Sequence, residues 1–190
     1  MQENIYFETI KCEDFEIFNL DFHNKRVANT IGLNINLQEY IYPLGDELLR
    51  CKVTYNDSEI LNVEYFPYKE REISSFKLIF DDEISYFKKY LNREKLDNLF
   101  SQKENCDEII IIKKGIVTDT SIANIAIFYK DNWITSKNCL LAGTTRARLL
   151  EEKFLIEKDI SLEMLKKASK IALMNAMIDF DIKENYSFKL

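Results

Sequence analysis

The run of four isoleucines at Ile109–Ile112 constrains this 190-residue sequence more than any other stretch. It is far shorter than the roughly 18 apolar residues that a membrane-spanning helix needs, and no apolar stretch in the chain approaches that length. Charged residues bound the run, and a turn at Gly115 follows it. The sequence therefore predicts a buried β-strand here and no association with a membrane.

The segments before this run predict an α+β chain. Two pairs of apolar runs indicate hairpins, one turning at Glu13–Asp14 and the other at "NDSE". Between them, "HNKRVANTIGLNI" predicts a helix that ends near Gly32. We expect two further strands over "ISSFKLIF" and "ISYFKKY", and a helix over "REKLDNLFSQ".

The second half predicts a similar mixture of strands and helices. A hairpin is expected to turn at Asp131–Asn132, and Gly143 is expected to lead from a loop into a helix. Ser161 is a candidate cap for another helix, and "IALMNAMIDF" predicts a strand. We expect two small α/β subdomains, covering residues 1–83 and 84–190.

The composition argues against several kinds of function. The net charge of −6 is unlike the basic face of a nucleic-acid-binding protein. The four cysteines form no CxxC pair and there is one histidine, so we expect reduced thiols and no metal site. The first residues lack the basic and apolar regions of a signal peptide, which favours a cytoplasmic protein.

Two segments of the second half carry groups that suit a polar or anionic ligand. In "LAGTTRARLL", a helix begins after a glycine, and its first N–H groups and dipole attract anions. In "VTDTSIANI", Asp119 stands among hydroxyl residues five positions before Asn124. Each segment taken alone has a commoner structural role, as an N-cap and as a side-chain turn between strands.

Two segments of the first half carry cationic groups. His23 and Arg26 lie three residues apart and so share one helix face, where an arginine can bind a phosphate; a packed histidine and a solvated arginine are the alternative. Lys88 and Lys89 are adjacent, and in a strand they point to opposite faces. One of them could form a Schiff base with a carbonyl cofactor, but periodicity does not decide which.

The order of these segments resembles the fold-type IV pyridoxal-phosphate enzymes. The matching stretches are "FETI", "HNKR", "KYLNR", "LMNAM" and the long run from "DEIIIIKKG" through "VTDTSIANI" and "WITS" to "LLAGTTR". This family includes branched-chain and D-amino-acid aminotransferases and 4-amino-4-deoxychorismate lyase. The resemblance implies the D-amino-acid-aminotransferase-like fold, with pyridoxal 5′-phosphate in the cleft between two subdomains and a shortened N-terminal half.

The resemblance also implies roles for individual residues. Lys89 matches the Schiff-base lysine because it stands four residues before Arg93, in the family's K-x-x-x-R pattern. Arg26 matches the arginine that binds the cofactor's phosphate. Asp119, five residues before Asn124, matches the carboxylate that faces the pyridine nitrogen, where the family usually has glutamate. The remaining residues implied to bind the cofactor are Asn124, Thr144, Thr145 and Asn175.

The resemblance favours a short 4-amino-4-deoxychorismate lyase that forms 4-aminobenzoate and pyruvate, with Lys89 moving the Cα proton. The alternatives are an aminotransferase for branched-chain or D-amino acids and a non-enzymatic cofactor-binding remnant. The expected partners are a small-molecule amine and, as in the family, a second copy of the chain. Candidates to meet the substrate carboxylate, or else exposed strand residues, are Arg50, Tyr68 and Arg71.

Overall fold

The computed structural model describes residues 4–190 and divides the chain into two compact units. Unit 1 holds the chain up to Glu70 together with Lys88–Asn92, and unit 2 holds Arg71–Phe87 and Arg93–Leu190. We expected one boundary between residues 83 and 84, whereas the backbone passes between the units three times.

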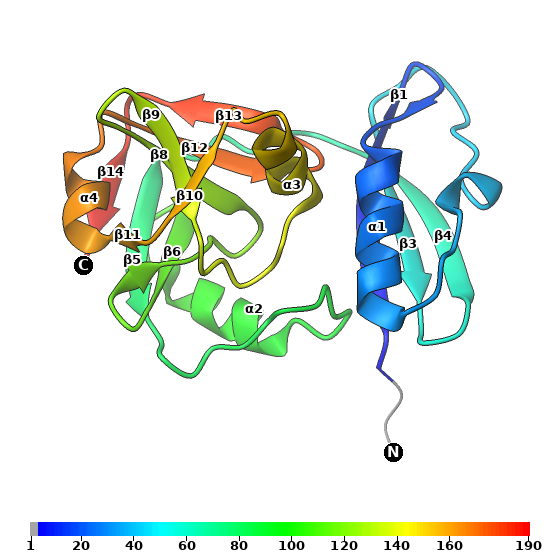
Figure 1. The fold of residues 1–190 in the computed structure, drawn as a ribbon, viewed down its shortest axis with the longest axis horizontal. Helices are drawn as coiled ribbons and strands as arrows, with labels where there is room; N and C mark the ends of the chain where they lie inside the picture. Colours follow the sequence, from blue (N-terminus) through cyan, green and yellow to red (C-terminus); the bar gives the residue numbers. More distant parts are fainter. Residues whose placement is uncertain (1–3) are drawn as a thin grey trace. The chain divides into compact units, whose positions relative to one another are not determined.

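Unit 1 is a four-stranded sheet, in the order β2-β1-β3-β4, covered by a helix (Figure 1). The apolar residues that alternate along β1 and β3 pack against α1 and the loop after it; they include Ile10, Val53, Val27 and Leu37. The elements are β1 (Tyr6–Glu13), β2 (Glu16–Ile17), α1 (Leu20–Ile31), the 3-10 helix η1 (Leu37–Glu39), β3 (Leu49–Tyr55) and β4 (Ile60–Pro67).

Unit 2 contains two five-stranded sheets, in the orders β10-β9-β8-β12-β13 and β11-β7-β6-β5-β14. Figure 1 shows α3 beside β12 and α4 beside β11. The elements are β5 (Ser75–Phe80), α2 (Glu94–Phe100), η2 (Ser101–Lys103), β6 (Glu108–Lys113), β7 (Ile116–Val117), β8 (Asn124–Tyr129), β9 (Asn132–Ser136), α3 (Thr144–Glu151), β10 (Ile156–Lys158), β11 (Ile160–Ser161), α4 (Leu162–Lys167), β12 (Lys170–Asn175), β13 (Asp179–Lys183) and β14 (Ser187–Lys189).

The isoleucine run forms β6, the central strand of its sheet, and the prediction of a buried strand is confirmed. Ile110 and Ile112 join a core cluster with Ile125 and Ile127 of β8, so the two sheets of unit 2 share apolar side chains. β6 pairs in parallel with β5, which explains why residues 75–80 belong to unit 2. A parallel partner distant in sequence is not visible in local patterns.

The segment predicted as a strand over "ISYFKKY" is not a regular strand. It contains one isolated bridge, between Tyr90 and Tyr6. Backbone hydrogen bonds tie its end to the beginning of β1: the Phe7 N–H donates to the Lys89 carbonyl at 2.9 Å and the Leu91 N–H to the Ile5 carbonyl at 2.8 Å. Because residues 84–87 and 88–92 belong to different units, the segment has no continuous strand partner.

Two other elements begin or turn earlier than the sequence predicts. The second-half hairpin turns at Lys130 and Asp131, one residue earlier than expected, and both have positive φ angles of 50° and 61°. Two positive φ angles give a turn that matches the twist of the flanking strands. α1 begins at Leu20 rather than near His23, and Gly32 ends it with a φ of 75°. Glycine adopts this left-handed conformation without steric cost.

Candidate functional site

In unit 1, a completely buried carboxylate joins the two predicted cationic residues. Glu8 lies on the core-facing side of β1, and His23 and Arg26 reach it from one face of α1. His23 Nδ1 is 2.6 Å from Glu8 Oε2, and Arg26 Nε donates to Glu8 Oε1 at 2.9 Å. Arg26 Nη2 donates to Glu8 Oε2, so the arginine binds the carboxylate with two donors.

The charges of this cluster fix its protonation. Burial alone would raise the pKa of Glu8, but the Arg26 charge and the His23 hydrogen bond outweigh it and lower that pKa to about 2. Burial lowers the pKa of His23, with Glu8 opposing and the charges of Arg26 and Lys89 adding to the decrease. At neutral pH, Glu8 is therefore ionised and His23 is neutral.

The two lysines lie on opposite sides of β1. Lys88 Nζ is 5.3 Å from the centre of the Tyr6 ring, and Lys89 Nζ is 4.6 Å from the centre of the Phe7 ring. Tyr6 and Phe7 are successive residues of β1 and point to opposite faces, so the two lysines contact opposite faces of β1, although their own segment is not the strand that we expected. Lys88, which the family pattern leaves without a role, is not a purely solvated lysine, because its Nζ donates to the Thr30 carbonyl in the last turn of α1 at 2.7 Å.

In unit 2, the buried Asp119 carboxylate accepts three hydrogen bonds. Asn124 Nδ2 donates to Oδ1 of Asp119 at 2.7 Å, while the backbone N–H groups of Leu140 and Leu141 donate to Oδ2 at 2.7 and 3.0 Å. Burial raises the pKa of Asp119 to about 6, although these donors and the Arg146 charge favour the ionised form. Oδ1 has one donor and so retains capacity for a further hydrogen bond.

The side-chain turn that we weighed for "DTS" is also present, but it is centred on the next residue. Thr120 Oγ1 accepts from the N–H of Ile122 at 3.3 Å and from that of Ala123 at 2.9 Å. Thr120 therefore builds the turn before β8, which leaves the Asp119 carboxylate directed at the loop that contains Leu140 and Leu141.

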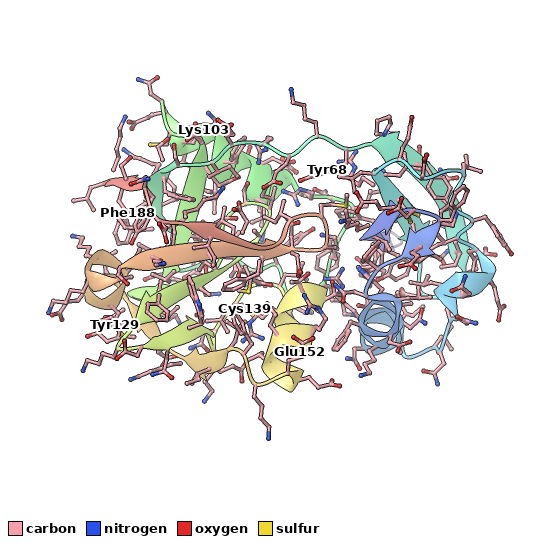
Figure 2. The ribbon with its side chains drawn as sticks, turned by 90° about the horizontal axis from the view of Figure 1, so that it is seen from above. Tyr68, Lys103, Tyr129, Cys139, Glu152 and Phe188 are labelled. Atoms are coloured by element: carbon pink, nitrogen blue, oxygen red, sulfur yellow. The ribbon has the colours of Figure 1, made fainter. Side chains whose placement is uncertain are left out.

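The beginning of α3 depends on a close approach between backbone and side chain. A Cβ at Gly143 would lie 2.1 Å from Asn124 Oδ1, so only glycine permits this packing. No side-chain hydrogen bond caps the helix, and within residues 4–190 the buried Thr145 Oγ1 has no hydrogen-bond partner. Figure 2 shows the loop containing Cys139 beside α3, with Glu152 after its last residue. The threonines do not fill the capping role that we weighed for them.

Arg146 was not predicted, yet it connects three elements around this helix start. Its Nη2 donates to the Ser136 carbonyl at 2.9 Å and to Glu157 Oε1 at 2.5 Å. Two further buried atoms, Arg146 Nε and Ser136 Oγ, have no protein partner within the described part of the chain. Buried polar groups are rarely left unpaired, so this region offers more donors than the protein itself uses.

Asn175, a predicted cofactor residue, and Arg93, the arginine of the K-x-x-x-R pattern, lie at the ends of elements in unit 2. Asn175 ends β12, and its Oδ1 accepts from the N–H groups of Met177 and Ile178 at 2.9 and 3.1 Å. Arg93 Nη2 donates to the Ser121 carbonyl at 2.9 Å, which ties it to the turn after Asp119. Asn175 therefore stabilises the turn that follows it, and Arg93 stabilises the turn next to Asp119.

The three candidates for a substrate carboxylate are not brought together by either unit. Arg50 and Tyr68 belong to unit 1, where the Arg50 guanidinium is stacked 5.0 Å from the centre of the Phe66 ring. Arg71 belongs to unit 2, and its Nη2 donates to the completely buried Glu108 at 3.2 Å. Their role in binding substrate stays a prediction.

Residues 4–190 show neither a metal-binding cluster nor a membrane-crossing helix. Residues 4–190 contain no cluster of three or more histidine, cysteine or acidic side chains that could hold a metal ion. None of their helices is both long and apolar enough to cross a membrane.

Comparisons with known proteins identify relatives over almost the whole chain. The sequence profile of the family Amino-transferase class IV matches residues 84–181, just over half of the chain. An "Uncharacterized protein" of Haemophilus influenzae is 34% identical over 182 residues, covering 90% of this chain and 96% of that protein. A "Putative aminodeoxychorismate lyase" of Schizosaccharomyces pombe is 27% identical, covering 93% and 87%.

Solved structures agree with the sequence relatives. A crystal structure of a "putative 4-amino-4-deoxychorismate lyase" from Haemophilus somnus superposes with a TM-score of 0.85 at 36% identity, covering 93% of this chain and 98% of that chain. A hypothetical aminotransferase from Mycobacterium tuberculosis in its PLP-bound form superposes with a TM-score of 0.79 at 13% identity, covering 98% and 81%. The second match supports the fold alone.

The described residues fit pyridoxal phosphate, the cofactor on which the class IV family depends. The buried Thr145 hydroxyl is an unused donor at a helix N-terminus, which suits a phosphate. Arg26 keeps its Nη1 group for another acceptor, and Asp119 keeps an acceptor site for a protonated ring nitrogen. By the profile match and by its identity to relatives of nearly equal extent, the chain belongs to the class IV aminotransferase family.

Proposed function

We propose that this protein is a pyridoxal-phosphate-dependent lyase that converts 4-amino-4-deoxychorismate to 4-aminobenzoate and pyruvate. The observation that carries the proposal is the match at 36% identity, over 93% of this chain and 98% of that one, to the Haemophilus somnus protein described as a "putative 4-amino-4-deoxychorismate lyase". The Schizosaccharomyces pombe relative bears the same description.

Five side chains would hold the cofactor. Arg26 and the beginning of α3, with Thr144 and Thr145, would bind the phosphate through N–H and O–H donors. Asp119 would accept from the ring nitrogen, and Lys89 would hold the aldehyde carbon. Asn124 assists by donating to the Asp119 carboxylate, and Gly143, which lacks a Cβ, leaves room for the Asn124 side chain.

The protein's own groups would then manage protons and charge. When bound, the cofactor supplies a sink for the electron pair that is left at Cα of the substrate. Lys89 would remove the Cα proton and return a proton to the departing three-carbon fragment. Asp119, with a pKa of about 6, is mostly ionised at neutral pH and can keep a ring nitrogen protonated.

Product analysis tests the reaction. The purified protein, loaded with pyridoxal phosphate, is mixed with 4-amino-4-deoxychorismate, and 4-aminobenzoate and pyruvate are quantified by chromatography. Equal amounts of the two products are expected. In a parallel reaction, branched-chain or D-amino acids are supplied with 2-oxoglutarate, and glutamate is measured.

An aminotransferase is the second candidate. Its support is the family match, because the model that covers residues 84–181 is that of Amino-transferase class IV. A "Putative amino-acid aminotransferase" of Mesorhizobium loti, with a TM-score of 0.79 at 17% identity and coverage of 98% of this chain and 99% of its own, supports the fold alone. Glutamate in the parallel reaction, without pyruvate in the first, would favour this candidate. Bound cofactor with neither product would favour a non-catalytic binding protein.

We also propose that the protein works as a homodimer in the cytoplasm, as its family resemblance implies. Light scattering on the purified, cofactor-loaded protein tests the first part. A mass near twice the 22.5 kDa of the chain is expected, and a mass equal to one chain would contradict it.

A further inference from the structure

Glu8 is the least expected residue of unit 1. It lies in β1 between apolar core positions and is 0% exposed, where a carboxylate loses its hydration. Its two oxygens accept from Arg26 Nε at 2.9 Å, from Arg26 Nη2, and from His23 Nδ1 at 2.6 Å. The Tyr55 hydroxyl lies 3.5 Å from Oε1.

Stability alone does not account for this arrangement. A buried ion pair is often no more stabilising than well-packed apolar residues of similar volume, because both charges must be desolvated. The neighbouring core-facing positions of β1, Tyr6 and Ile10, show that apolar residues fit this side of the strand. A carboxylate at position 8 therefore calls for a role beyond packing.

Glu8 fixes the orientation of the Arg26 side chain. The carboxylate occupies the edge of the guanidinium formed by Nε and Nη2, so the planar group cannot rotate without breaking two charge-assisted hydrogen bonds. The Nη1 group lies outside this edge, and the Arg26 side chain is 13% exposed. The orientation of the Nη1 N–H donors is therefore fixed by the two hydrogen bonds to Glu8.

His23 forms a third hydrogen bond with the same carboxylate. Because Glu8 is ionised and can only accept, Nδ1 of His23 must be the protonated ring nitrogen. With His23 neutral, the charges of Glu8 and Arg26 cancel within the cluster. Because Glu8 offsets the charge of Arg26, the direction of the Arg26 N–H groups matters for recognition of a phosphate here.

We propose that Glu8 is a positioning residue that aims the remaining N–H groups of Arg26 at the phosphate of the bound cofactor. The proposal rests on the proposed function, which assigns Arg26 to that phosphate. It predicts that Glu8 matters for cofactors that carry a phosphate and not for the same ring without one.

The test compares two ligands that differ only in the phosphate. Dissociation constants of pyridoxal phosphate and of pyridoxal are measured by absorbance titration for the wild-type protein, for Glu8→Gln and for the matched control Glu64→Gln. Glu64 lies on β4 of the same sheet and its side chain is 41% exposed. In Glu8→Gln, the preference for the phosphorylated ligand should fall about tenfold or more, because an oriented charge-assisted donor is lost. The control should keep the full preference.

A double-mutant cycle shows whether Glu8 acts through the arginine. Arg26→Lys keeps the positive charge but loses the planar fork, so it should reduce the preference by a similar factor. Glu8→Gln combined with Arg26→Lys should reduce it no further, because both changes remove the same interaction. If Glu8→Gln does not fold, Glu8→Asp replaces it, since the shorter carboxylate keeps its charge but cannot hold both Arg26 nitrogens.

The outcomes separate this proposal from the proposed function. A wild-type protein that binds no pyridoxal phosphate would contradict the proposed function. A wild-type protein with a strong preference that Glu8→Gln leaves unchanged or increases would overturn the role of Glu8 alone. Additive losses in the double variant would also overturn it.

Discussion

The polar clusters of the two units differ in how completely they are paired. In unit 1, both oxygens of Glu8 accept hydrogen bonds from Arg26 and His23. In unit 2, three buried polar atoms around the beginning of α3 have no partner among residues 4–190: Ser136 Oγ, Thr145 Oγ1 and Arg146 Nε. The first cluster holds its own geometry, whereas the second supplies donors that a ligand would complete.

The largest expected effect concerns the lysine beside the paired cluster. Lys89→Ala should lower the proposed lyase rate by about 1,000-fold or more, because it removes the group proposed to move the proton. After borohydride reduction, wild-type protein should carry the cofactor on the peptide containing Lys89, as detected by mass spectrometry. Lys88→Ala is the matched control, and it should keep the label. Label on Lys88 would contradict the assignment.

The next effect probes the carboxylate of unit 2. Asp119→Asn keeps the shape of the side chain but loses its charge, so it should lower the rate by about 100-fold. Cofactor binding should weaken less, because the phosphate contacts remain. Steady-state rates and absorbance titrations measure the two effects. A rate within a few fold of wild type would exclude the proposed role of Asp119 at the ring nitrogen.

The two buried carboxylates should give opposite pH dependences of stability. The pKa of Glu8 falls from 4.5 to about 2 on folding, so its contribution is complete above pH 4.5 and is lost as the pH falls toward 2. The pKa of Asp119 rises from 3.8 to about 6, so stability should fall as the pH rises from 4 to 6. Each effect is about 3 kcal/mol at most.

Urea unfolding of the cofactor-free protein between pH 2 and 7 measures these dependences. Glu8→Gln should flatten the profile below pH 4.5, and Asp119→Asn should remove the decrease between pH 4 and 6. If both variants keep the wild-type profile, neither carboxylate controls the pH response.

The smallest effect tests the unpaired hydroxyl directly. Thr145→Val should leave the free energy of unfolding within about 1 kcal/mol of wild type, because no protein hydrogen bond is broken. It should weaken pyridoxal phosphate binding by about tenfold without changing pyridoxal binding. In the control, Thr135→Val, the Thr135 hydroxyl loses its hydrogen bond to the Ile125 carbonyl, 2.9 Å away. The control should lose about 1 kcal/mol of stability and no affinity.

Local patterns predicted the elements better than they predicted pairing between distant elements. The isoleucine run and the glycine that ends α1 carry their signals in neighbouring residues, and both predictions were confirmed. The parallel pairing of β5 with β6 joins residues about 30 positions apart, so the boundary between the units could not be located. The irregular path of residues 84–91 was missed for the same reason, because its hydrogen bonds go to Ile5 and Phe7, which are distant in the sequence.

The order of the motifs along the chain predicted part of the candidate site. The resemblance named Arg26 and Asp119, and the structure places each in a buried cluster. Glu8 was missed although alternation along "YFETIKC" puts a charge at a core-facing position, which is itself a signal. Arg146 had no such signal, because its partners Ser136 and Glu157 are 10 and 11 residues away.

The hydrogen bonds between the beginning of β1 and residues 89–91 have a consequence for synthesis of the chain. They cover backbone groups of Ile5 and Phe7 that would otherwise form an open sheet edge. The first segment of unit 1 ends at Glu70, and residues 89–91 follow about 20 positions later. During translation, that edge therefore stays open until residues 89–91 have left the ribosome. A nascent chain stalled before Lys88 would leave this edge exposed as a template for aggregation.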